Sequence, residues 1–312
     1  MTRAILAALL LLCFLGQALA DDGLADQIDD TFTKAKSWLS KENLSLTGNS
    51  SGRDDAAAFR QEVILFAGEA VGNPNAVSPA QREQGAKRAA EVMAQRAVAE
   101  YLNGFALVGD TLVKDGMLEY DSVRSAVNGV VKGVQVVCKD YSQEKDSAIV
   151  IVKLGMHGPE GFGSAIYQKM FKDPELKKSL TEVDGKQAPK FKHKVEPLDE
   201  KYDGLIIDAS EQSFKPALFN RIFSSKNELL YDPSRVSQKV LVEQGCGEYT
   251  NTVEKARAAL GARGIKNPLI VKATGTVSAA DLQVSDQDAV NIFSANQKVS
   301  FLEGAKVAFV LK

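Results

Sequence analysis

A strongly signalled helix near residues 78–104 constrains the fold of this chain most. Ser78 is a favourable N-cap residue, Pro79 fits the first helical position, and Gln81 completes a capping box. Gly104 is expected to end the helix in the left-handed conformation. The expected core face is rich in small side chains, so another backbone layer can approach it closely. Its members are Ala86, Ala89, Ala90, Met93, Ala97 and Tyr101.

Short apolar runs on both sides of this helix predict strands. Asp121 is expected to cap a second, shorter helix that contains Val123, Val127 and Val130. The resulting order of strand, helix, strand, helix and two further strands predicts a mixed sheet covered by helices over residues 59–156. The expected strands span residues 62–68, 105–113, 134–139 and 148–154.

A second domain of the same kind is expected over residues 201–312. Asn251 and Ser285 each stand three residues before an acidic side chain, a spacing typical of helix N-termini. The predicted fold class is α+β, with two small domains, each a mixed or antiparallel sheet covered by helices, preceded by an amphipathic N-terminal helix. The expected strands of the second domain span residues 205–207, 218–223, 228–231, 240–242, 269–276 and 307–311.

Residues 157–200 differ in composition from both domains and are expected to connect them. Glycines and prolines interrupt the apolar pattern, while Ile166, Met170 and Phe171 allow one short helix. A basic stretch follows, which is either a partner-binding strip or a solvated connector. It contains Lys186, Lys190, Lys192, His193 and Lys194.

Residues 1–20 have the order of a cleavable secretory signal peptide. Arg3 supplies a positive charge, residues 4–15 are uninterruptedly apolar, and residues 18–20 place small side chains at a cleavage site. The apolar stretch is shorter than the roughly 20 residues needed to cross a bilayer, which favours cleavage over an uncleaved anchor. The mature chain is expected to begin at Asp21 in the periplasm, and the sequence leaves association with the outer membrane open.

Residues 21–58 are expected to form an amphipathic helix and a flexible linker. Apolar residues recur at helical spacing over residues 23–41, and acidic residues precede basic ones, which suits the helix dipole. The small and polar residues of 45–55 predict the linker. The apolar stripe docks on the chain's own fold, on a partner protein or on a membrane surface, and the pattern does not separate these three. The candidate docking residues are Leu24, Ile28, Phe32, Trp38 and Leu39.

The net charge and the cysteines further narrow the range of possible functions. The formal net charge is −2 at pH 7, and loss of Arg3 with the signal peptide removes one more positive charge. Such a balance lacks the basic excess of a nucleic-acid-binding protein. Cys138 and Cys246 stay in the mature chain, either paired in a disulfide or as two separate thiols.

The residue pattern predicts no catalytic, cofactor or metal site. His157 and His193 are the two histidines, and neither accompanies a nucleophile motif. Together with the cysteines they lack the spacing of zinc ligands. The glycines of residues 155–163 lack the P-loop lysine and the dinucleotide fingerprint. The aspartates of residues 281–288 lack the spacing of an EF-hand.

A recurring pattern of alanine, glycine and valine extends over about residues 60–155. It is carried by residues 75–81, 86–90, 97–104, 108–113 and 127–133. This pattern resembles the Lpp-twenty type lipoprotein domain family, which is similar to the flagellar proteins FlgP and the N-terminal part of FlgT. The resemblance implies an envelope-associated, non-enzymatic protein, in some members part of rings or sheaths around the flagellar base. Leu12 precedes Cys13 where a lipobox needs a small residue, so the resemblance does not extend to lipidation.

The expected function is that of an exported, non-enzymatic cell-envelope protein that acts through protein–protein contacts, with self-association and flagellar outer-ring assembly as special cases. The alternative is a periplasmic binding module for a small envelope ligand, a glycan or lipid fragment, in a cleft between the domains. A third interpretation is a hydrolase that uses carboxylates such as Asp208 or Glu243. A broad exposed apolar patch favours the partner, and a concave polar and aromatic surface favours the ligand. We expect no cofactor, no nucleic-acid partner and at most peripheral contact with a membrane.

Overall fold

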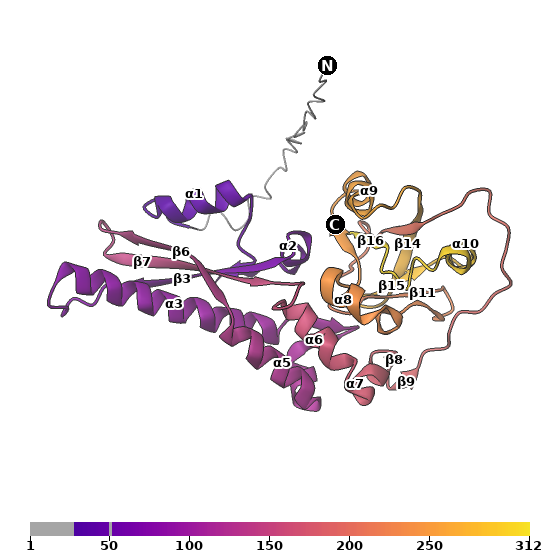
Figure 1. Cartoon of the computed structure of the whole chain (residues 1–312), viewed down its shortest axis with the longest axis horizontal. Coiled ribbons are helices and arrows are strands. Elements are labelled where there is room, and N and C mark those ends of the chain that lie inside the picture. The colour runs from indigo at the N-terminus through magenta and orange to yellow at the C-terminus, as the bar shows by residue number, and fades with distance from the viewer. Residues whose placement is uncertain (1–27, 50–51) are drawn as a thin grey trace, which may run out of the picture.

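The computed structural model describes residues 28–49 and 52–312 and confirms the expected α+β fold. Two sheets of different construction form the two halves of the molecule (Figure 1). The first sheet belongs to residues before 156 and the second to residues after 203. Short helices between them form part of the junction.

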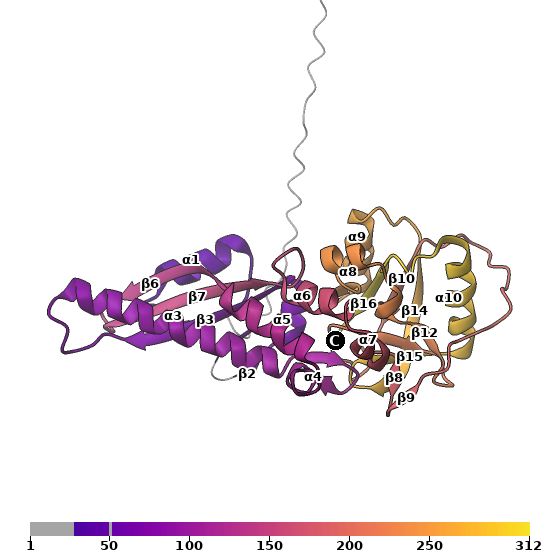
Figure 2. The ribbon, with the colours of Figure 1, turned by 60° about the horizontal axis from the view of Figure 1, so that its bottom comes forward.

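The first sheet is built around a long antiparallel pair. β3 and β7 are paired along their full length, from Val63 opposite Gly155 to Val71 opposite Ser147. β6 continues the sheet beyond β7, whereas β1 meets β3 at one position on its other side. Figure 2 shows β7 between β6 and β3. The sheet order is β2 (Gly52–Arg53), β1 (Gly48–Asn49), β3 (Val63–Val71), β7 (Ser147–Gly155) and β6 (Gln135–Ser142).

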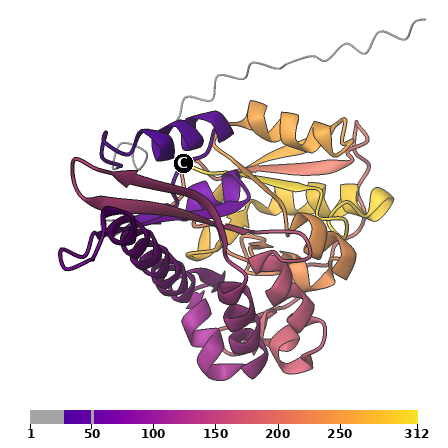
Figure 3. The ribbon, with the colours of Figure 1, turned by 60° about the vertical axis from the view of Figure 1, so that its left-hand side comes forward.

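Helices cover both faces of this sheet. α1 (Thr33–Glu42) lies on one face and α3 (Pro79–Asn103) on the other (Figure 3). The remaining elements of this half are α2 (Asp55–Arg60), β4 (Ala106–Val108), β5 (Thr111–Leu112), α4 (Val113–Glu119) and α5 (Asp121–Lys132).

The contact between α3 and β3 is a backbone-to-backbone contact, as the small residues of the helix predicted. A Cβ atom on Gly68 would lie 2.3 Å from the carbonyl oxygen of Ala90 and 2.3 Å from the nitrogen of Ala94. Because neither backbone atom can move away, only glycine fits there. The buried stripe of α3 differs from the expected one, since Ala89 and Met93 are exposed. It follows the four-residue row Ala86, Ala90, Ala94 and Val98, and then Tyr101 and Leu102.

Three of the capping predictions for α3 and α5 are wrong. The Ser78 hydroxyl accepts the N–H of Gln81 as expected, but the Gln81 side chain accepts from Val77 rather than from Ser78. Gly104 has a φ of −89°, so the helix does not end in the left-handed conformation. Asp121 is the first residue of α5 rather than its cap.

Two segments of the first half differ from the expected elements. The described residues of the expected flexible linker over 45–55, which are 45–49 and 52–55, instead hold β1, β2 and the buried residues Leu46 and Thr47. The Thr47 hydroxyl accepts the Leu65 N–H at 3.0 Å, which pins this segment to β3. Residues 105–113 are not one strand but the β4–β5 hairpin, which turns at Gly109 with a φ of +58°.

The N-terminal helix is shorter than its apolar pattern indicates. Residues 28–32 form turns, and α1 begins at Thr33. The Asp140 carboxylate of β6 accepts the N–H groups of Lys34 and Ala35 at 2.9 and 3.1 Å, so a long-range contact satisfies the first helical turn. Residues 23–27 of the expected helix lie outside the described residues.

The second sheet is mixed and larger. β10, β14, β16 and β13 form a parallel core, and β15, β11 and β12 extend it on one side through two antiparallel pairs. The sheet order is β12 (Leu229–Tyr231), β11 (Arg221–Phe223), β15 (Asp281–Val284), β14 (Pro268–Ser278), β10 (Gly204–Asp208), β16 (Val307–Val310) and β13 (Glu248–Thr250).

Three helices pack around this sheet: α8 (Gln238–Gln244), α9 (Val253–Ala262) and α10 (Asp286–Val299). Ser285 caps α10 as expected, whereas the cap of α9 is Thr252 rather than Asn251. Residues 240–242 lie in α8 and not in a strand, because Ser237 caps a helix there. β13 and β15 were not expected from the sequence.

Residues 157–180 are part of the core rather than a connector. They form α6 (Phe162–Met170) and α7 (Pro174–Ser179), and β8 (Glu182–Val183) and β9 (Lys186–Gln187) follow. The buried Tyr167 hydroxyl donates to the Leu218 carbonyl at 2.9 Å, and Ser164 donates to the Val242 carbonyl at 2.6 Å. One apolar core therefore continues from the first half into the second.

Aromatic side chains fill the junction between the halves. The ring centres of Phe59 and Tyr249, one from each half, lie 4.7 Å apart. The ring centres of Phe105 and Phe162 lie 5.3 Å apart. The alternative interpretation as a ligand-binding module places a cleft between the domains, but this part of the junction is packed with side chains. Among residues 28–49 and 52–312, no helix combines the length with the apolar character that a membrane span requires.

Candidate functional site

Three of the five candidate docking residues lie against the chain's own sheet. Ile28, Phe32 and Leu39 are buried, and Trp38 is half-buried beside them. Leu24 lies outside the described residues. Of the alternatives that the stripe left open, docking on the chain's own fold accounts for these contacts. The sheet residues that they meet are Leu65, Cys138, Ile149 and Ile151.

Most of the residues that the sequence offered for catalysis or metal binding lie in environments that the fold itself explains. Cys138 and Cys246 are free and buried, and burial raises the pKa of both thiols. The Asp208 carboxylate accepts the N–H and hydroxyl of Ser210, and no bond of this kind links it to Glu243. Within the described part of the chain, no three His, Cys, Asp or Glu side chains are grouped as metal ligands.

His157 differs from these residues, because it is largely buried and one of its ring nitrogens has no partner among the described residues. Its ring packs against Gly245, where an added Cβ atom would lie 2.4 Å from Cε1. Its Nδ1 atom has no hydrogen-bond partner among the described residues. Burial, and then the nearby Arg263 charge, lower the pKa of the imidazole from 6.5 to about 4.

This environment makes stability depend on pH. The unfolded chain binds a proton at His157 below about pH 6.5, while the folded chain does not until about pH 4. The contribution of His157 is therefore fully present above pH 6.5 and is lost as the pH falls toward 4, by up to about 1.4 kcal/mol for each pH unit. We expect His157→Gln to flatten urea-unfolding stability over this window. The variant His193→Gln, at an exposed site, controls for loss of a histidine, and a profile equally steep in both variants would contradict the assignment.

A large groove lies along the margin of β3 in the first half. Its volume is about 1120 Å³. β3 supplies Phe66 to Glu69, α3 supplies the wall from Met93 to Tyr101, and Ile28, Leu46 and Arg53 lie opposite. Apolar side chains alternate in the groove with two arginines and two glutamates: Arg53, Arg96, Glu69 and Glu100.

On the side away from β7, no strand among the described residues pairs with β3 beside Glu69, which lines this groove. Thr47 donates to the Leu65 carbonyl on the side away from β7. Because strand residues alternate, Glu69 and Val71 direct their N–H and C=O groups to that same side. The ladder with β1 contains only the pair Gly48 and Phe66, so it stops before reaching them.

An unpartnered hydroxyl lies at the inner end of the groove. Tyr101 is 5% exposed, and its hydroxyl has no hydrogen-bond partner among the described residues. The Arg53 guanidinium lies over the ring at 4.5 Å from its centre. Burial, and then the nearby Asp55 carboxylate, raise the pKa of this phenol well above its usual value, so it stays protonated at neutral pH.

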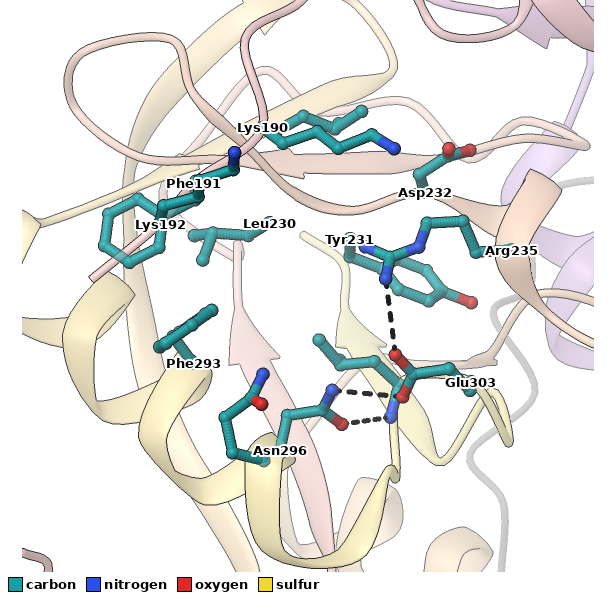
Figure 4. A pocket seen from close by; sticks show the side chains of 13 residues that line it. Lys190, Phe191, Lys192, Leu230, Tyr231, Asp232, Arg235, Phe293, Asn296 and Glu303 are labelled. Atoms are coloured by element: carbon teal, nitrogen blue, oxygen red, sulfur yellow. Dashed lines mark hydrogen bonds and ion pairs between the residues drawn. The ribbon is translucent and has the colours of Figure 1, made fainter. Parts of the chain in front are cut away.

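A second, smaller cavity lies in the second half, under residues 189–196, which we call the basic strap. Its volume is about 190 Å³. Figure 4 shows Phe191 and Phe293 on one side of the cavity and Arg235 with Glu303 on the other. Leu230 and Leu302 contribute further apolar lining. The cavity is concave, polar and aromatic, but it lies within the second half rather than between the halves.

The basic strap is held in place by main-chain bonds. The Leu229 N–H donates to the Pro189 carbonyl at 2.7 Å, and the Phe191 N–H donates to the Leu229 carbonyl at 3.0 Å. Farther along, the Glu196 N–H donates to the Ser294 hydroxyl of α10. Lys190 and Lys192 are thereby placed at the cavity. The basic stretch was noticed in the sequence, but Arg235, Leu230 and Phe293 carried no signal there.

The comparisons with known proteins concern this second half. Residues 204–312 match the family described as Treponema pallidum Tp0624, second domain. No curated protein matches the chain. The match includes β10 to β16 and the cavity walls from β12 and α10, whereas the basic strap precedes it. The resemblance of the first half to the Lpp-twenty type family stays a prediction.

Proposed function

We propose that this chain is an exported, non-enzymatic protein of the cell envelope that binds a protein partner through the open edge of β3. The observation that carries the proposal is the groove beside Glu69 and Val71, where the ladder with β1 has already ended. The signal-peptide pattern of residues 1–20 supports export. Assembly of a flagellar outer ring is one setting in which such a partner would be found.

The groove suits a partner segment in extended conformation. An exposed strand edge offers main-chain donors and acceptors that another strand can pair with. The outward N–H and C=O groups of Glu69 and Val71 provide such a template, and α3 forms a wall beside it through Met93 and Ala97.

The side-chain chemistry of the groove indicates the partner's sequence. In an added strand, alternate side chains point to the same face, so every second residue would meet Ala67 and Ile149 on the α1 side of the sheet, while Phe66 lies on the α3 side. Arg96 and Glu100 stand at its rim with opposite charges, and a partner with both signs would complement them. We therefore propose a segment in which apolar residues alternate with polar or charged ones.

Removing a single N–H tests the proposal. A photo-crosslinking benzoylphenylalanine placed at Met93, in cells that produce the protein, is expected to give one discrete adduct. Glu69→Pro removes the outward N–H but leaves the pairing with β7 intact, so it should abolish the adduct. Glu69→Ala keeps the N–H and should retain the adduct. The same crosslinker at the exposed Leu118 is the positional control.

Three outcomes would overturn the proposal. One is an adduct that survives Glu69→Pro as well as Glu69→Ala, because main-chain pairing would then not matter. Another is an adduct with a second copy of this chain, which would make the groove a self-association site. The third is an adduct confined to the chain itself that disappears when residues 21–27 are deleted, which would make the occupant internal.

A further inference from the structure

The cavity under the basic strap has the size of one side chain or one ring. Its volume of about 190 Å³ is below the roughly 300–1,000 Å³ typical of sites that enclose a drug-sized ligand. Phe191 and Phe293, whose ring centres lie 5.7 Å apart, close one side of it. Together with Leu230 and Leu302 they present apolar surface to whatever enters. The cavity therefore selects a compact apolar group.

The cations around the cavity are not matched by free anions. Lys190 and Lys192 form no ion pair with any described residue, although neighbouring basic residues do, as in Lys178 with Glu182. Arg235 forms an ion pair with Glu303 at 3.8 Å, so of the three cations only the two lysines lack a described counter-charge. Three cationic side chains thus converge on one small cavity from two separate segments.

The acidic residues of the lining are already engaged. The Glu303 carboxylate accepts the Asn296 side-chain N–H at 3.0 Å. Asp232 is buried, and its carboxylate accepts the N–H and the hydroxyl of Ser234 at 2.9 and 2.8 Å. Both groups therefore hold the local structure together, while the lysines remain available to a ligand.

We infer that this cavity binds a small organic anion whose apolar body is about the size of one amino-acid side chain. The apolar body lies between Phe293, Leu230 and Leu302, and the anionic group lies toward Lys190, Lys192 and Arg235. A carboxylate and a phosphate monoester share this chemistry. The site is separate from the β3 groove, so its occupancy does not depend on the proposed partner.

Binding of three small probes to the full mature chain tests the inference. N-acetylphenylalanine and phenyl phosphate carry the anion on an aromatic body, and N-acetylphenylalaninamide is the matched neutral probe. Isothermal titration is expected to show saturable binding of one or both anions and binding of the amide at least about tenfold weaker, which corresponds to about 1.4 kcal/mol. The stronger of the two anions identifies the head group. Binding should weaken as salt is added.

Variants of exposed residues locate the site. The pair Lys190→Gln and Lys192→Gln is expected to weaken anion binding about tenfold or more. The pair Lys186→Gln and Lys194→Gln removes the same charge from the same stretch outside the cavity and should change binding less than about twofold. Gln297→Trp, on the exposed rim, should block entry.

The inference is overturned if neither anion binds at millimolar concentration, or if the amide binds as well as the acids. It is also overturned if both lysine pairs weaken binding equally, because the effect would then come from the net charge of the surface. Unchanged binding to Gln297→Trp would place the probe elsewhere on the molecule.

Discussion

Replacing Asp281 with alanine is expected to lower the free energy of unfolding by about 3–5 kcal/mol. Asp281 is fully buried, and its carboxylate accepts Nε of Arg221 at 2.8 Å and Nη2 at 2.5 Å. The Ser278 hydroxyl donates to the same carboxylate at 2.6 Å. Without Asp281 the guanidinium charge stays buried and loses its counter-charge, which is the costly event. Urea denaturation followed by circular dichroism measures the loss.

The same ion pair holds the junction together. Nη1 of Arg221 donates to the carbonyls of Leu180 and Glu182 at 3.0 and 2.7 Å, which ties α7 and β8 to the second sheet. Replacing both partners, as Arg221→Met with Asp281→Leu, should recover much of the lost stability because no charge is left buried. Glu211→Ala, in the exposed pair with Lys272, should leave the midpoint nearly unchanged. A single variant as stable as this control would contradict the expected result.

Replacing Phe32 with alanine is expected to cost about 3–5 kcal/mol, the range for deleting a buried aromatic ring. Phe32 is 0% exposed and packs with Leu39, Leu65 and Ile151. Truncation leaves a cavity between α1 and the sheet, because the long β3–β7 pair cannot collapse into it. Trp38 is the chain's single tryptophan and half-buried next to this contact, so its fluorescence reports the loss.

The emission of Trp38 separates docking within one chain from docking between chains. In the native protein it should not change on dilution, because Phe32 and its contacts belong to the same chain. In Phe32→Ala it should shift to the red at lower urea concentration than in the native protein. Leu118→Ala, at a residue that is 85% exposed, should stay within about 0.5 kcal/mol of the native stability. A native spectrum that shifts on dilution would contradict the assignment.

Local hydrogen bonding explains which parts of the fold could be predicted. The caps at Ser78 and Ser285 bond to N–H groups three residues away, so the sequence contains both partners. The apolar runs at β3, β7, β10 and β14 are likewise visible as runs, because strands buried on both faces need nearly continuous apolar residues. The alanines of α3 predicted that another backbone packs closely against this helix, although not that Gly68 is the residue in contact.

Long-range contacts explain the errors. α1 begins at Thr33 because Asp140, more than a hundred residues away, accepts its first N–H groups. Residues 45–55 have the composition of a linker, yet Thr47 is bonded to Leu65 of a strand that comes later in the chain. Residues 157–180 have a loop-like start, but their apolar side chains complete the junction between the two halves.

The sequence by itself determined the α+β class, the long helix, most of the strands of the two large sheets and the apolar stripe around Phe32. Periodicity and capping are properties of neighbouring residues, so they can be recognised without the fold. Only the tertiary structure decided where the ladder beside β3 ends and which side chains surround the cavity under the basic strap. The register of strand pairing and the packing of the elements bring together residues that are far apart in the chain, such as Lys190 and Arg235. A local sequence pattern carries no information on the distance between such residues.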